Sequence, residues 1–221
     1  MRNMNIKEKI TSIKSSLPDG VKLIAVSKFQ SVATIQAAYD TGQTVFGENR
    51  VQELVTKQPL LPEDIEWHFI GTLQTNKVKY IIPFIAMIQS VDSLQLMREI
   101  NRQAEKINRT IRVLIEVHIA EEESKHGFAV DECQSLFLNH FFASFTHIQV
   151  CGLMGMATFT DCKAQVEREF GVLKNLFETI KAMPHTDKTI FTELSMGMSD
   201  DYQLAIEKGS TMVRIGTAIF K

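Results

Sequence analysis

The sequence predicts a single (β/α)8 TIM barrel, an α/β fold, preceded by an extra N-terminal helix. Eight short apolar runs recur along the chain, segments with helical spacing lie between them, and 221 residues suffice for this fold. The runs are continuously apolar, which is typical of strands buried on both faces of a parallel sheet. A doubly wound open sheet is the main alternative, because the third and fourth helices between the runs are short.

Each expected strand corresponds to one apolar run. The eight runs span residues 21–29, 44–47, 67–71, 85–91, 112–119, 148–156, 190–194 and 212–220. The extra helix is expected over residues 4–16, before the first run. Ser31 is suited to cap the helix after the first strand, and Gly42 is placed to end it.

Three further helices follow from spacing and capping signals. The longest places apolar residues three and four apart on one face, and Pro184 prevents it from continuing. Its apolar residues are Val166, Phe170, Leu173, Phe177 and Ile180. Another carries a single apolar stripe made by Leu96, Met97, Ile100, Ala104 and Ile107. A short helix is expected to open at residues 199–201 and to close at Gly209.

Composition restricts the class of protein. With 24 basic and 26 acidic residues the net charge is -2, which argues against nucleic acid as the main partner. No apolar stretch approaches the roughly 18 residues that span a membrane, and the N-terminus lacks the apolar core of a secretory signal. Three cysteines without C-x-x-C spacing favour a reducing, cytoplasmic location.

No linker divides the chain, so we expect one domain over residues 1–221. No metal-ligand spacing is found among the histidines.

Lys28 is the first candidate for a functional residue. In a parallel barrel the active site is built from the carboxyl ends of the strands, and Lys28 ends the segment VKLIAVSK (residues 21–28) of the first run. The period of two places it on the same side as Ile24 and Val26. If it faces the barrel mouth, partial desolvation favours the neutral amine, which can condense with an aldehyde as a Schiff base. The competing interpretation is a solvated strand end.

Arg214 is the second candidate, because it lies inside the last apolar run. A buried guanidinium must be paired or hydrogen-bonded. It could form a structural salt bridge, or it could bind a ligand. The carboxylates proposed for a salt bridge are Glu48, Glu193 and Asp92.

The loops after the seventh and eighth strands suggest a phosphate site, as is common in barrels of this class. Glycines let the backbone approach a ligand closely, as at Gly216, and the hydroxyls of Ser199 and Thr217 can donate to phosphate oxygens. Two features oppose this interpretation. Ser199 can instead cap the following helix, and Asp200 and Asp201 would repel an anion.

Six segments, in order from about residue 21 to the end, resemble the pyridoxal 5'-phosphate homeostasis proteins, also called the YggS/PROSC family. They are AVSK at 25–28, FGENRVQE at 46–53, WHFIGTLQTNK at 67–77, SVDS at 90–93, ELSMGMSDD at 193–201 and GSTMVRIGTAIF at 209–220. The resemblance implies a (β/α)8 barrel similar to the N-terminal domain of bacterial alanine racemase.

The resemblance also assigns roles. It implies that Lys28 binds pyridoxal 5'-phosphate (PLP) as a Schiff base, that Asn49 lies beside the cofactor ring, and that Arg214 reaches the pyridine nitrogen. The residues that it implies for the phosphate are Ser199, Gly216 and Thr217. A guanidinium that keeps its proton leaves the pyridine nitrogen unprotonated, which makes the ring a poor electron sink. The sequence departs from the family at Phe29-Gln30, at His118 and in lacking the usual short tail after Lys221.

By resemblance, the expected function is PLP binding in vitamin B6 homeostasis, without a robust catalytic activity. The expected partners are PLP and, transiently, apo-forms of PLP enzymes, with the chain a monomer or weak dimer. The alternative is a PLP-dependent amino-acid racemase, which needs a second acid/base group opposite Lys28. Racemases take it from a second domain, which we do not expect after Lys221, and Tyr39, Tyr80 and Tyr202 all fall in helical segments. A third interpretation makes Lys28 and Arg214 a paired structural core.

Overall fold

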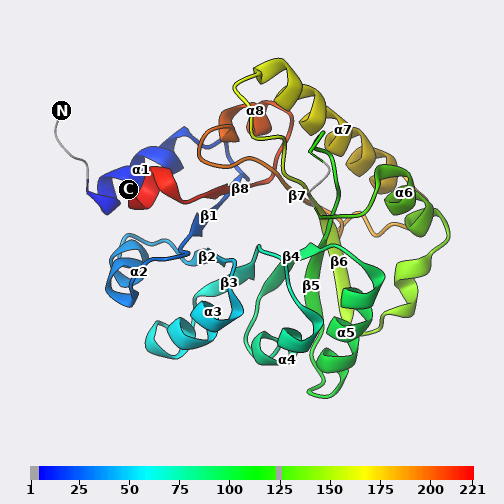
Figure 1. Ribbon diagram of the computed structural model, residues 1–221, viewed down its shortest axis with the longest axis horizontal. Helices are drawn as coiled ribbons and strands as arrows, with labels where there is room; N and C mark the ends of the chain where they lie inside the picture. The colour runs from blue at the N-terminus through cyan, green and yellow to red at the C-terminus, as the bar shows by residue number, and fades with distance from the viewer. Residues whose placement is uncertain (1–4, 123–125) are drawn as a thin grey trace.

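The computed structural model describes residues 5–122 and 126–221, and its strands form a closed parallel barrel (Figure 1). Each strand pairs with the next along the chain, and β8 pairs with β1. The strands are β1 Lys22–Val26, β2 Val45–Glu48, β3 Glu66–Phe69, β4 Met87–Val91, β5 Ile111–Glu116, β6 Ile148–Met154, β7 Glu193–Ser195 and β8 Met212–Ile215. The predicted (β/α)8 barrel is therefore confirmed, and the open doubly wound sheet is excluded.

Helices surround the barrel (Figure 1). The α-helices of the described residues are α1 Ile6–Ser16, α2 Val32–Tyr39, α3 Val51–Lys57, α4 Val78–Ile81, α5 Leu94–Glu105, α6 Val130–Leu138, α7 Lys163–Lys181, α8 Tyr202–Glu207 and α9 Thr217–Phe220. Short 3-10 turns lie at η1 Gln58–Leu60, η2 Thr75–Lys77 and η3 Phe141–Ser144. The extra N-terminal helix is confirmed as α1, which contacts α2 and α9, while Met4 of the expected span lies outside the described residues.

The helix ends follow the capping chemistry of the sequence. Ser31 caps α2 by accepting a hydrogen bond from the Thr34 amide at 3.1 Å, as predicted. Helix α7 ends before Pro184, also as predicted. Helix α5 ends at Glu105, so the prediction that Ile107 belongs to its apolar stripe is wrong: Ile107 lies beyond the helix and is exposed.

Apolar side chains fill two regions. The larger lies between the strands and the helices, and a smaller cluster fills the barrel itself. The inner cluster comprises Ile24, Met87, Leu114, Cys151, Met154 and Met212. Several polar side chains are buried as well, among them His68, Gln89, Ser195 and Arg214. The barrel strands therefore carry buried polar groups that need partners of their own.

Two features bear on the predicted environment of the chain. Cys133, Cys151 and Cys162 are all free thiols, and burial raises the pKa of Cys133 to about 12. None of the helices in the described part of the chain combines the length and apolarity of a bilayer-spanning segment.

Candidate functional site

Lys28 lies two residues beyond the end of β1, in a turn rather than in the strand. The next residue, Phe29, has a φ of +64°, in the left-handed region. The prediction that the strand alternation extends to Lys28 is therefore wrong, since alternation holds only in extended backbone. The expected desolvation is also wrong, because the Lys28 side chain is exposed. Its ammonium group has no hydrogen bond or ion pair with a described residue, so it can meet a ligand without breaking a contact.

A buried ammonium group holds the turn that carries Lys28. Lys57 Nζ lies 2.8 Å from Glu48 Oε1, 2.9 Å from Glu53 Oε2 and 3.1 Å from the Ser27 carbonyl. The Ser27 hydroxyl donates to Glu48 Oε1 at 2.8 Å, and the Phe29 amide donates to Glu53 Oε2 at 2.9 Å. We call the five residues Ser27, Phe29, Glu48, Glu53 and Lys57 the Lys57 clamp. The hydrogen bonds among them hold the backbone on both sides of Lys28.

Sequence reasoning missed the Lys57 clamp. The available signal was the spacing of Glu53 and Lys57, four residues apart on one helix. Such a pair usually indicates a solvated helix face, whereas Lys57 is buried here.

Asn49 follows the end of β2, which is the barrel neighbour of β1. Its Oδ1 atom is buried and has no hydrogen-bond partner among the described residues. The close packing of Gly71 on Asn49 requires glycine, since a Cβ at Gly71 would lie 2.6 Å from the Asn49 carbonyl oxygen. Because an unpaired buried acceptor is costly, Asn49 Oδ1 fits a ligand that brings a donor.

Arg214 is buried in β8 and is held by neutral oxygens. Its Nη1 donates to Ser195 Oγ at 2.7 Å, and its Nη2 donates to the Gly155 carbonyl at 3.0 Å. Burial lowers the pKa of Arg214 to about 10, against the opposing effects of Asp201 and Glu116. The guanidinium is therefore charged at neutral pH.

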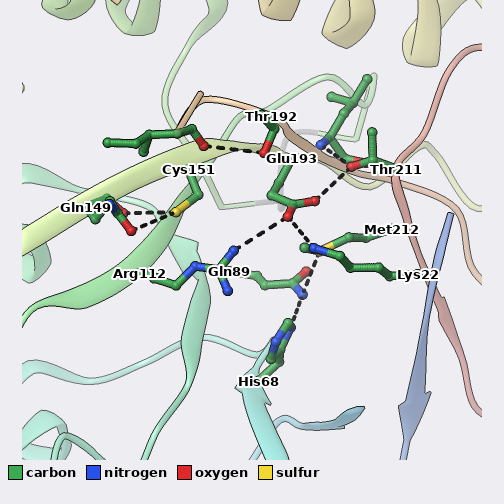
Figure 2. Close-up of polar contacts among 12 residues, drawn as sticks. Lys22, His68, Gln89, Arg112, Gln149, Cys151, Thr192, Glu193, Thr211 and Met212 are labelled. Atoms are coloured by element: carbon green, nitrogen blue, oxygen red, sulfur yellow. Dashed lines mark hydrogen bonds and ion pairs between the residues drawn. The ribbon is translucent and has the colours of Figure 1, made fainter. Parts of the chain in front are cut away.

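The structural salt bridges suggested for Arg214 are not formed. Glu48 pairs with Lys57, and Glu193 pairs with Lys22 at 2.5 Å and with Arg112 at 3.5 Å (Figure 2). Within residues 5–122 and 126–221, no carboxylate forms an ion pair with Arg214. The suggested pairing of Lys28 with Arg214 is also wrong, because Lys28 is exposed and Arg214 is buried.

Glu116 is a buried carboxyl group at the carboxyl end of a barrel strand. It ends β5, and burial together with Asp92 raises its pKa to about 7, while Arg214 acts in the opposite direction. The carboxyl group of Glu116 therefore changes its charge near neutral pH, within the electrostatic reach of Arg214.

Ser199 and the segment after β8 come together as predicted. The Ser199 hydroxyl accepts hydrogen bonds from the backbone amides of Gly216 at 3.3 Å and Ala218 at 3.4 Å. Thr217 lies between these two amides and is exposed. The two N–H groups thus converge on one oxygen, which is the arrangement that a phosphate oxygen would also satisfy.

The competing role of Ser199 as a helix cap is wrong. Helix α8 begins at Tyr202, and its N-cap position is Asp201. The Asp201 side chain accepts a hydrogen bond from the Met198 amide at 2.5 Å, within its own loop. One of the two carboxylates expected to repel an anion is therefore engaged in holding the loop.

The six candidate residues lie at or after the carboxyl ends of four neighbouring strands, β7, β8, β1 and β2. They are Lys28, Asn49, Ser199, Arg214, Gly216 and Thr217. Lys28 and Asn49 follow adjacent strands, and Arg214 lies in β8 on the other side of β1. No cluster of three metal-binding side chains occurs among the residues that the structure describes. The arrangement suits an anionic ligand that also reacts with a primary amine.

Residues 3–221 match the family model described as the N-terminal domain of alanine racemase. The pyridoxal phosphate homeostasis protein of Pasteurella multocida is 44% identical over 206 residues, covering 90% of this chain and 85% of the relative. The chain belongs to the pyridoxal phosphate homeostasis protein family. The member of this family from Synechocystis sp. is 37% identical over 212 residues, or 95% of each chain.

Solved structures support the placement in the pyridoxal phosphate homeostasis protein family. PipY of Synechococcus elongatus without PLP has a TM-score of 0.89 at 33% identity, covering 98% of this chain and 100% of PipY. PipY with PLP bound has a TM-score of 0.86 at 32% identity, with the same coverage. Alanine racemase from E. faecalis, at 17% identity and a TM-score of 0.74, shares the fold alone and is matched over 57% of its length.

Proposed function

We propose that this chain is a PLP-binding protein of vitamin B6 homeostasis that holds PLP on Lys28 and has no robust catalytic activity. The observation that carries the proposal is the accessible Lys28 amine, on a turn just beyond β1, whose two neighbouring strands lead to Asn49 (β2) and carry the buried cation Arg214 (β8). The relative PipY, which has been solved with PLP bound, supports it. When bound, PLP supplies an aldehyde that condenses with a primary amine and releases water.

The residues present fit this cofactor. Asn49 Oδ1 is a buried acceptor that needs a donor, and Arg214 is a charged donor without a carboxylate partner among the described residues. The amides of Gly216 and Ala218 already converge on the Ser199 hydroxyl. In the proposal Lys28 forms the covalent bond, Asn49 contacts the ring and Arg214 donates to the pyridine nitrogen. The phosphate is held by Ser199, Gly216 and Thr217.

The same site argues for a carrier rather than a racemase. A guanidinium that stays protonated at neutral pH leaves the pyridine nitrogen unprotonated, so carbanions are poorly stabilised. Racemisation also needs a second acid/base group opposite Lys28. Tyr39, Tyr80 and Tyr202 lie in α2, α4 and α8, and none of them ends a strand.

The remaining parts of the proposal concern organisation and partners. Residues 1–221 form one PLP-binding barrel domain, a monomer or weak dimer that meets apo-forms of PLP enzymes transiently. The three free thiols suit the reducing cytoplasm, which is where we place the protein. Neither nucleic acid nor a membrane is a partner, consistent with the net charge of -2.

The first prediction concerns the purified protein, which should be yellow or become yellow when PLP is added. Borohydride should remove the visible absorbance, because it reduces the C=N bond and fixes the cofactor to the chain. Peptide mapping should then find the added mass on the peptide that contains Lys28. Colourless protein that takes up no added PLP would overturn the proposed function.

A second prediction separates carrier from racemase. PLP-loaded protein incubated with L-alanine and other L-amino acids in deuterated water should show no deuterium incorporation at Cα with enzyme-like turnover. An authentic alanine racemase is the positive control, and Lys28→Ala is the negative control. Rapid incorporation by the wild type, lost in Lys28→Ala, would identify the chain as a racemase.

A further inference from the structure

A chain of hydrogen bonds runs through the buried polar side chains of the barrel from Arg214 to His68. Arg214 Nη1 lies 2.7 Å from Ser195 Oγ, Ser195 Oγ lies 2.7 Å from Gln89 Oε1, and Gln89 Nε2 lies 2.8 Å from His68 Nδ1. The four side chains come from β8, β7, β4 and β3, and all are buried. Figure 2 shows the last link of this chain, with dashed lines from Gln89 to His68 and to Met212.

The direction of each hydrogen bond follows from the chemistry of Arg214. A guanidinium can only donate, so Ser195 Oγ accepts from it, and the Ser195 proton is free to go to Gln89 Oε1. Gln89 then presents its NH₂ group to His68, whose Nδ1 must accept. The neighbouring Met212 Sδ, 3.8 Å from Gln89 Nε2, is a weak acceptor and fits this orientation.

This direction fixes the state of His68 as a neutral imidazole with its proton on Nε2. Burial, with contributions from Arg112 and Lys22, lowers the pKa of His68 to about 3, which agrees with a neutral ring. The Nε2 atom is buried and has no hydrogen-bond partner among the described residues. The reverse orientation of Gln89 would turn its oxygen toward the Met212 sulfur and leave the Ser195 proton without this acceptor.

The hydrogen-bond chain from Arg214 to His68 contains no carboxylate, so none of its members neutralises the charge of Arg214. A carboxylate in the place of Ser195 or Gln89 would orient the guanidinium but would also neutralise it. Neutral groups orient Arg214 while leaving its charge uncompensated at contact distance. Two of its five N–H groups are used by Ser195 and Gly155, which leaves three for other partners.

We propose that Ser195, Gln89 and His68 are positioning residues that hold Arg214 as a fixed, fully charged donor for the pyridine nitrogen of bound PLP. The identity of the ligand rests on the proposed function, whereas the direction of the chain does not. The two can therefore be tested apart.

The direction is tested on the full chain prepared without PLP, by ¹⁵N NMR of the His68 ring. We expect the Nε2–H tautomer and no titration between about pH 5 and pH 8. In Gln89→Glu the new carboxylate cannot donate, so His68 Nδ1 should gain a proton and donate to it. The Nδ1–H tautomer in the wild type would overturn the proposal, because the chain would then run in the opposite direction.

The positioning role is tested with PLP-loaded protein. In Gln89→Glu we expect PLP to dissociate about tenfold faster, with a shifted visible absorption maximum, because the new charge partly neutralises Arg214. The matched control is Gln149→Glu on β6, which should change neither readout, because among the described residues the Gln149 side chain has a single hydrogen bond, accepted from the Cys151 thiol. Equal dissociation rates and spectra in Gln89→Glu and Gln149→Glu would overturn the positioning role.

A second variant covers the case in which Gln89→Glu does not fold. Ser195→Ala removes the oxygen between Arg214 and Gln89 without adding a charge, and it should also speed PLP dissociation and shift the spectrum. Wild-type values in folded Ser195→Ala would overturn the proposal. A wild type that binds no PLP at Lys28 would instead overturn the proposed function, and the His68 tautomer would still decide the direction of the chain.

Discussion

Lys28→Ala is expected to abolish covalent PLP binding while leaving the stability of the barrel within about 0.5 kcal/mol of the wild type. The Lys28 side chain is exposed, lies beyond β1 and has no hydrogen bond or ion pair with a described residue. Its removal therefore costs little packing or electrostatic energy, but it removes the amine. The measurements are a PLP titration followed by visible absorbance, peptide mapping after borohydride treatment, and urea unfolding.

Lys188→Ala provides the matched control for this experiment. Lys188 is also an exposed lysine in a loop, between α7 and β7, so its replacement should alter neither covalent binding nor stability. Residual PLP in Lys28→Ala should be removed by dialysis, since only noncovalent contacts remain. Full trapping by borohydride in Lys28→Ala would place the covalent bond on another lysine and contradict the site.

The fold could be predicted because its signal is local. Continuously apolar runs, cap residues such as Ser31 and the stop at Pro184 are all readable along the chain. The positions of the strand ends are predicted less accurately, because an apolar run can continue beyond the last residue with extended backbone. The run that contains Lys28 continues to residue 29, whereas β1 ends at Val26.

The candidate site was predictable only in part. Strand ends indicated Arg214 and Ser199, since parallel strands present their carboxyl ends on one side of a barrel. The hydrogen-bond partners of Arg214, Ser195 and the Gly155 carbonyl, were not predictable, and neither was the link from Ser195 to Gln89, which lies 106 residues away in the sequence. Barrel closure alone brings β4, β7 and β8 close enough for one hydrogen-bond chain, and no local pattern records such a pairing.

Lys57→Met is expected to lower the free energy of unfolding by about 3–5 kcal/mol, as when one partner of a buried ion pair is removed. Glu48 is fully buried, its Oε1 binds Lys57, and its Oε2 has no hydrogen-bond partner among the described residues. The variant would leave this carboxylate with only the Ser27 hydroxyl. Urea unfolding of the variant and the wild type measures the difference.

The loss of stability in Lys57→Met should increase with pH. Burial already raises the pKa of Glu48, and Lys57 opposes this rise, so the variant should raise that pKa further. When the pH lies below the unfolded-state pKa, such a carboxyl group is protonated and neutral in both states and costs no stability. As the pH increases, the unfolded state loses its proton more readily than the folded state, so the fold is destabilised. The deficit of Lys57→Met should therefore be small near pH 4 and large at about pH 8.

Two controls distinguish a buried charge from a general loss of a lysine. Lys174→Met removes an exposed pair with Glu178, also four residues apart, and should cost at most about 0.5 kcal/mol. The double variant Lys57→Met with Glu48→Gln should recover much of the loss, because it removes the unpaired charge and keeps an acceptor for Ser27. A pH-independent deficit, or no recovery in the double variant, would contradict the electrostatic account of the Lys57 clamp. Since the clamp also holds Ser27 and Phe29, the folded single variant should form its bond with PLP more slowly than the wild type.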